Sequence, residues 1–306
     1  MADWLTVKRR GSALGTDFYK KWACQKMIES SQTNIWEGHW ACAVLALIGV
    51  LEDNLVPGTL EAAIRKNLEK TVEEHPNDKL YRVDKEYADF RNGILSLLVK
   101  KDQSCHALGH DVIYAYYMLA MLSRSEIPAT AELYNAMTKL LEGFAASGPG
   151  YVTINGNNTV IDPEGIPVTA TRVPLTPAVV LDLFHNFQRP YPMEKGDMQL
   201  GHLLTHGHSI LELKQAFHDH GLVQSETSLF TRLDILIYAN GLEKNPTEYD
   251  LPFTTTMSSP LEQPFWEQAF ADSRHGHYYK YAYSYLKLNR MAGRNPSDFG
   301  SFGRIL

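Results

Sequence analysis

The stretch that decides the fold reads GHWACAVLALIGVLED at residues 38–53, where a Gly-His pair opens a nearly uninterrupted apolar run. The same opening occurs three more times, ahead of the runs HDVIYAYYMLAMLS, HLLTHGHSILELKQAF and HYYKYAYSYLKLNRM. The four pairs are Gly38-His39, Gly109-His110, Gly201-His202 and Gly276-His277. Helices that are apolar on most sides are buried, so we expect four inner helices, each headed by a histidine.

Amphipathic stretches alternate with these apolar runs and are expected to form outer helices. Residues 60–75 and 131–145 each place their apolar side chains on one helical stripe. The four histidines are 71, 92 and 75 residues apart (110 − 39, 202 − 110 and 277 − 202), which indicates degenerate repeats with extra length in the middle. We therefore predict an all-α fold, either an α/α-barrel-like structure or a closed array of helical hairpins, as a single domain over residues 1–306.

The extra length coincides with a segment rich in Gly, Pro, Thr and Val at residues 147–175. The turn pairs Asn155-Gly156 and Pro163-Glu164-Gly165 separate short runs of β-type residues. We predict a small β-hairpin insertion near residues 150–172. It is interpreted either as a lid over a site or as a connection on the surface.

Composition excludes several classes of protein. The 306 residues carry a net charge of −6, which argues against a nucleic-acid binder with a basic surface. No signal-peptide pattern and no uncharged apolar run of membrane-spanning length are apparent, so we expect neither secretion nor membrane insertion. The three widely spaced cysteines (Cys24, Cys42 and Cys105) fit a reducing cytoplasm. The sequence leaves the oligomeric state open.

The histidines are the first candidates for chemistry, because neutral imidazole binds metals and moves protons near neutral pH. His202 and His206 are four residues apart and share one helix face, a spacing that suits a divalent metal. Asp111 directly follows His110 and is expected to orient or replace a ligand. The alternative is that each histidine caps its helix or lies in the core, hydrogen-bonded to the backbone.

Aromatic residues follow two of the histidines. Tyr114 and Tyr281 lie four residues after His110 and His277, so each tyrosine shares a helix face with its histidine. With Lys280, one turn after His277, they are expected to bind a flat, oxygen-bearing substrate through stacking, hydrogen bonds and charge. Ordinary helix packing is the alternative interpretation.

Three blocks of this sequence resemble the questin oxidase-like proteins. The blocks are NIWEGHWACAVLALIGV at 34–50, CHALGHDVIYAYYMLAM at 105–121 and GHYYKYAYSYLKLNRMAGRNP at 276–296. The resemblance implies a helical fold with histidine-headed helices and oxidative cleavage of polycyclic aromatic polyketides, with reduced nicotinamide (NADPH) and O2 as co-substrates. The positions it transfers as catalytic candidates are His39, His110 and His277. The sequence lacks GxGxxG and the other nucleotide-binding motifs, so a built-in Rossmann site is not expected.

Three hypotheses follow from these observations. The first is an oxidoreductase that oxidises, or inserts oxygen into, a flat polyketide-like small molecule in a pocket lined by His and Tyr. The second is a metal-dependent hydrolase or lyase in which the histidines hold a metal that activates water. The third is a non-catalytic helical ligand-binding protein. Convergence of His39, His110, His202 and His277 separates the first two hypotheses from the third.

Overall fold

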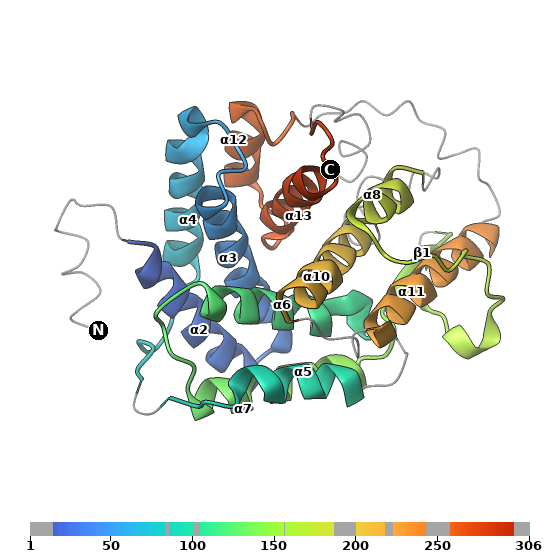
Figure 1. Cartoon of the computed structure of the whole chain (residues 1–306), viewed down its shortest axis with the longest axis horizontal. Helices are drawn as coiled ribbons and strands as arrows, with labels where there is room; N and C mark the ends of the chain where they lie inside the picture. The colour runs from blue at the N-terminus through green and yellow to red at the C-terminus, as the bar shows by residue number, and fades with distance from the viewer. Residues whose placement is uncertain are drawn as a thin grey trace.

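Helices dominate the fold, and a single short hairpin interrupts them in the part of the chain that the structure describes (Figure 1). The computed structural model describes residues 15–83, 86–100, 105–155, 157–186, 200–217, 223–242 and 258–296. The predicted all-α class with a small β-hairpin is confirmed.

Four inner helices form the centre of the molecule (Figure 1). They are α3 (Gly38–Glu52), α6 (His110–Ser123), α10 (His202–Phe217) and α13 (His277–Met291). Helix α3 packs against α6 and α13, and α10 packs against the same two helices, so the four close into a ring. Their near-complete burial matches the apolar runs in the sequence.

Amphipathic helices surround this ring. Helix α2 packs on α3 and α7, α4 on α3 and α12, α5 on α6 and α7, and α8 on α10 and α13. Thr130 caps α7, because its side chain accepts a hydrogen bond from the backbone N–H of Leu133. The bounds of the outer helices are α2 (Thr16–Gln32), α4 (Glu61–Glu74), α5 (Phe90–Lys100), α7 (Ala131–Ala146), α8 (Pro177–Asn186), α11 (Val223–Leu242) and α12 (Gln263–Ala271).

The predicted hairpin consists of β1 (Tyr151–Ile154) and β2 (Asn157–Val160), which pair antiparallel with Tyr151 opposite Val160. Strand β1 lies against α11. The chain after the hairpin is held to the same helix by Asp234, whose carboxylate accepts hydrogen bonds from the backbone N–H groups of Thr169 and Ala170 and pairs with Arg172 at 2.6 Å. The insertion is therefore anchored on α11.

One cluster of buried hydrophobic residues runs from Tyr19 in α2 to Leu288 in α13. Residues 35–52, which include α3, are long and apolar enough to cross a membrane by length and composition alone. In the structure, 61% of this stretch is buried among the other helices.

Candidate metal centre

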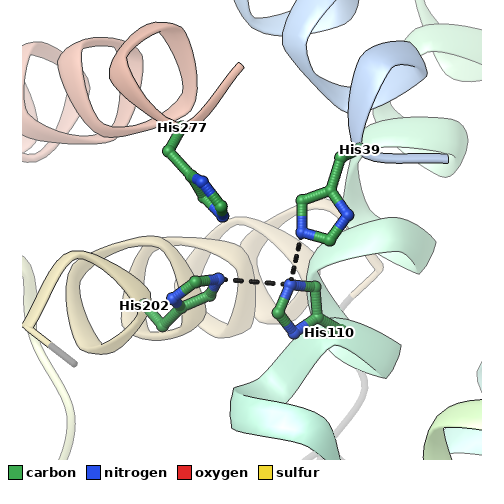
Figure 2. Close-up of side chains that lie close together, drawn as sticks. All are labelled: His39, His110, His202 and His277. Carbon is green, nitrogen blue, oxygen red and sulfur yellow. Dashed lines mark hydrogen bonds between the residues drawn. The ribbon is translucent and has the colours of Figure 1, made fainter. Parts of the chain in front are cut away.

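Four histidines meet inside the ring of inner helices (Figure 2). Each offers one ring nitrogen, and these four nitrogens all lie within 4.8 Å of one another. The Nε2 atom of His110 is 2.8 Å from Nε2 of His39 and 3.1 Å from Nε2 of His202. The fourth member is His277, and all four side chains are buried. The sequence left open whether the four Gly-His histidines converge, and the structure shows that they do.

The convergence arises because the amino-terminal ends of the four inner helices point to one place. His110, His202 and His277 are the first residues of their helices, and His39 is the second residue of α3. A side chain at the start of a helix projects beyond the end of the helix when the preceding backbone turns away. The ring of helices thus becomes a ring of imidazoles at this end.

Unusual backbone conformations precede two of these histidines. Three consecutive residues before His110 have positive φ angles: Ala107 at 45°, Leu108 at 64° and Gly109 at 88°. Before His277 the same pattern occurs at Arg274 (47°), His275 (57°) and Gly276 (74°). Left-handed conformations cost non-glycine residues of order 1–3 kcal/mol each and cluster at functional sites.

These left-handed turns orient the imidazoles. Each turn brings the carbonyl oxygen three residues back onto Nδ1 of its histidine, Ala107 O for His110 and Arg274 O for His277. In α3, His39 Nδ1 lies 2.7 Å from the carbonyl oxygen of Trp36, again three residues back. A carbonyl oxygen only accepts hydrogen bonds, so these three Nδ1 atoms carry the proton and their Nε2 atoms present lone pairs to the centre.

Tyrosine hydroxyls contact two of the imidazoles at Nδ1, on the edge of the ring that faces away from the centre. Tyr114 Oη is 3.0 Å from Nδ1 of His39, and Tyr281 Oη is 3.3 Å from Nδ1 of His202. Each tyrosine belongs to the helix that pairs with the helix of its histidine. A hydrogen bond at Nδ1 orients a ligand imidazole and raises its basicity, so both hydroxyls act on the ligands from outside the centre.

The glycines explain how these tyrosines come so close. A Cβ atom on Gly38 would overlap the ring of Tyr114, and one on Gly201 would overlap the ring of Tyr281. The pair α3 and α6 therefore repeats in the pair α10 and α13. In each pair the first glycine admits a tyrosine, and the second glycine, Gly109 or Gly276, ends a left-handed turn.

The electrostatics keep the imidazoles neutral. Burial, followed by the nearby charge of Lys280, lowers the pKa of His110 to about 3. Burial, followed by Lys280, also lowers the pKa values of His39 and His277 well below the usual 6.5. Two neutral imidazoles whose protons are both on Nδ1 have no proton to share between their Nε2 atoms. Their 2.8 Å approach is therefore repulsive unless a cation lies between them.

The donor set fits a metal ion. Zinc–imidazole bonds of about 2.0–2.1 Å in a tetrahedron separate the nitrogens by roughly 3.3 Å, close to the 2.8 and 3.1 Å between His110 and its two neighbours and within the 4.8 Å that spans the group. Among the described residues, Nε2 of His277 is buried and has no hydrogen-bond partner, as expected for a nitrogen that binds a metal. No thiolate or carboxylate belongs to the group.

The two other predicted metal ligands have different partners. His206 lies one helical turn beyond His202, about 6 Å further along the axis, and its Nε2 is 3.2 Å from the hydroxyl of Ser228. Its ring lies so close to Gly109 that a Cβ there would overlap it. The carboxylate of Asp111 accepts a hydrogen bond from the backbone N–H of Val112 at 2.9 Å. Neither side chain belongs to the group of four.

Lys280 and the two tyrosines were predicted to bind substrate. Lys280 is buried one turn after His277, and burial lowers its pKa to about 7. Tyr114 and Tyr281 are also buried, with their hydroxyls on the ligand imidazoles. The structure therefore gives the tyrosines a positioning role, while substrate binding by these three residues stays a prediction.

One residue at the centre was missed from the sequence. Trp36, in the short 3-10 helix Ile35–Glu37, has its ring centroid 5.2 Å from that of His110 and 5.8 Å from that of His39. The signal in the sequence was its position three residues before His39, where its carbonyl would face Nδ1.

Comparison of the whole sequence with family models, curated proteins and solved structures gave no match.

Proposed function

We propose that this protein is a metal-dependent oxidoreductase that holds one first-row transition metal on His39, His110, His202 and His277. Its substrate would be a flat, oxygen-bearing organic molecule, which it oxidises or into which it inserts oxygen. One observation carries the proposal: the Nε2 atoms converge at 2.8 and 3.1 Å while the Nδ1 protons of three rings are committed to backbone carbonyls. A cation held by the ring nitrogens would relieve the close approach of His39 and His110, whose Nδ1 protons are both committed to carbonyl oxygens.

The donor set favours a redox metal over a structural zinc ion. Imidazole suits iron, copper, nickel and zinc, whereas magnesium and calcium prefer oxygen ligands. Structural zinc sites use four ligands that commonly include cysteine, and catalytic zinc sites commonly use three protein ligands and a water. His39, His110, His202 and His277 would hold the metal through neutral imidazole nitrogens, a donor set that iron(II) accepts. When bound, iron supplies the redox chemistry that the protein side chains lack.

The field at the centre favours an anionic substrate. The imidazoles of His39, His110 and His277 are neutral because burial lowers their pKa values, so they would leave the charge of a divalent metal uncompensated. The amino termini of α3, α6 and α13 add partial positive charge at the same place, and Lys280 adds to it in its protonated form. Such a field stabilises the enolate or phenolate form of a substrate over its neutral form.

The surrounding residues hold the ligands in place. The carbonyl oxygens of Trp36, Ala107 and Arg274 fix the tautomer of three imidazoles, and the hydroxyls of Tyr114 and Tyr281 support two of the four rings. Because the centre is buried, bulk water is excluded, which strengthens every electrostatic interaction inside it. These are the contributions of the protein itself to the proposed reaction.

Metal analysis of protein purified without a histidine tag tests the proposal. We expect one iron per chain in the wild-type protein and near-complete loss in His110→Ala and His277→Ala. His208→Ala is the matched control, because His208 is equally buried in α10 but lies outside the group of four. A metal whose free concentration is 100 times its Kd stabilises the fold by about 2.7 kcal/mol. Chelation should therefore lower the melting temperature of the wild type and the control, but not that of His110→Ala or His277→Ala.

Oxygen consumption separates the redox reaction from the hydrolytic alternative. An oxidoreductase of this kind consumes O2 when given a polycyclic phenol or quinone and a reductant, whereas a hydrolase consumes none. Wild-type protein that takes up neither iron, copper nor zinc, and whose stability none of them changes, would overturn the proposal.

A further inference from the structure

Trp36 is an exposed residue that contacts the group of four buried histidines. It is 41% exposed, whereas the four histidines are between 1% and 6% exposed. Its ring contacts two of the histidines, with centroids 5.2 Å from His110, edge to face, and 5.8 Å from His39. The indole therefore spans the distance from solvent to the ligands within a single residue.

A hydrogen bond joins Trp36 to the centre a second time. The backbone carbonyl oxygen of Trp36 accepts the Nδ1 proton of His39 at 2.7 Å, which makes a short, mostly covalent path from the residue to the ligand. The ring of Phe144 packs against the indole with centroids 5.4 Å apart, and Asn34 Oδ1 accepts a hydrogen bond from the backbone N–H of Trp36 at 3.1 Å. The indole is thus fixed in position although much of its surface is in water.

Tryptophan and tyrosine are the aromatic side chains that lose a single electron most readily. Tyr114 also contacts His39, but it is fully buried, and burial raises its pKa well above 10. It has no contact with a carrier in solution and no acceptor for its proton in bulk water. An indole loses an electron without losing a proton, so exposed Trp36 is the better relay.

We propose that Trp36 carries single electrons between the metal centre and one-electron carriers in solution. This inference rests on the proposed redox function. In the oxidising direction one electron passes from the metal(II) ion through the indole to the carrier in a single tunnelling event, so no free indole radical forms. The net change is one metal(II) oxidised to metal(III) and one carrier reduced, with no bond formed or broken and Trp36 unchanged.

Stopped-flow mixing of iron(II)-loaded protein with ferricyanide, without oxygen, tests the relay. Trp36→Phe keeps an aromatic ring over the ligands but replaces the indole with a ring that is much harder to oxidise. We expect its second-order rate constant to fall by about tenfold or more, a change of at least ~1.4 kcal/mol in the barrier, with unchanged iron content. Trp40→Phe is the matched control, because Trp40 stacks on His75 at 3.7 Å and should react at the wild-type rate.

A covering role for Trp36 gives a different pattern. If the indole only shields the ligands, Trp36→Phe reacts at the wild-type rate, and only Trp36→Leu changes the affinity for iron. That result overturns the relay and leaves the metal site intact. A wild-type protein that holds no iron overturns both proposals. Repeating the measurement with a cationic cobalt(III) oxidant should give the same slowing, since the relay does not depend on the charge of the carrier.

Discussion

Polar side chains cluster at both ends of the inner helices, but the two clusters differ in how their charges and hydrogen bonds are balanced. At their carboxyl-terminal ends, Asp53 pairs with Lys287 at 2.6 Å and with Arg124 at 3.3 Å, and Arg124 also reaches Glu212 at 3.4 Å. Tyr283 donates a further hydrogen bond to Asp53 at 3.1 Å. At the amino-terminal ends His39, His110 and His277 turn the lone pairs of Nε2 toward one another and toward His202. One cluster of polar groups is balanced by its own charges, and the other could hold a metal ion.

The comparison teaches how to distinguish a structural polar cluster from a binding site. Both clusters contain partly or fully buried polar groups on α3, α6, α10 and α13. In the cluster around Asp53, each charge has an opposite charge beside it, so nothing further is required. In the group of four histidines, the backbone hydrogen bonds of His39, His110 and His277 lie on the outer side of the rings, so Nε2 of His39 and Nε2 of His110 meet as two acceptors. The position of the protons, more than the degree of burial, marks the site.

The largest expected effect comes from the left-handed turn that holds His277. In Gly276→Ala the new Cβ would overlap Ala43, and a non-glycine residue would occupy a φ of 74°. Strain and overpacking together should lower the free energy of unfolding by about 3 kcal/mol and abolish metal binding. Urea unfolding and metal analysis measure both effects.

Gly148→Ala is the control for that change. Gly148 also has a positive φ, 67°, but no atom lies within 4 Å of its added Cβ. Gly148→Ala should lower the free energy of unfolding only by the cost of a left-handed non-glycine residue, about 1–2 kcal/mol. The variant should keep its metal. Equal metal loss in both variants would contradict the role of the turn before His277.

The next largest effect concerns the cluster around Asp53, and it tests whether this cluster is independent of the four histidines at the other end of the inner helices. Asp53→Asn removes the charge shared by Lys287 and Arg124, whose side chains are partly screened by solvent. We expect a loss of about 2 kcal/mol in the free energy of unfolding, between the values for exposed and buried pairs. The loss should be the same with and without a chelator, because this cluster does not depend on a metal. A loss that varies with metal would show that the two ends are coupled.

A smaller effect is expected from the tyrosines behind the ligands. Tyr114→Phe and Tyr281→Phe each remove one hydroxyl from Nδ1 of a ligand imidazole and keep the ring that packs on glycine. Loss of such a contact typically weakens metal affinity by about 10–100-fold. Because the two helix pairs match, the two variants should behave alike in competition with a chelator. Tyr116→Phe, which loses only a contact with Tyr283 at 3.2 Å, should bind metal normally.

The smallest effect concerns pH at the balanced end. Burial lowers the pKa of His208 to about 3, so it stays neutral in the folded protein while the unfolded chain protonates near pH 6.5. The unfolded state therefore binds more protons below pH 6.5, and folding stability falls as the pH falls. Between pH 7 and 5.5, His208 should lower the free energy of unfolding by about 1 kcal/mol. His208→Gln should abolish this loss. Urea unfolding in chelator at both pH values measures the difference, and an identical pH dependence in both proteins would contradict it.

Much of the fold was predictable from local patterns. The Asn155-Gly156 pair placed the hairpin, and Thr130 marked the start of α7. The apolar runs after each Gly-His pair identified the inner helices. These features depend on hydrophobic periodicity and turn chemistry, which act over a few residues and are visible in any single sequence.

The candidate site was predictable only in part. Four repeats of one pattern made convergence of His39, His110, His202 and His277 the question to test, and the structure shows that they converge. The spacing of His206 and the position of Asp111 also suited a metal, yet these side chains have other partners. Spacing along one helix says which residues share a face, but not what the neighbouring helix places opposite them.

The sequence by itself determined that this chain forms histidine-headed inner helices, because apolar periodicity and the repeated Gly-His pairs are local properties. Only the tertiary structure decided which nitrogen of each imidazole faces the centre. That choice depends on carbonyl oxygens presented by left-handed turns, and on tyrosine hydroxyls from a helix about 75 residues away in the chain. It is this long-range placement of protons that turns four buried histidines into a group that could hold a metal ion.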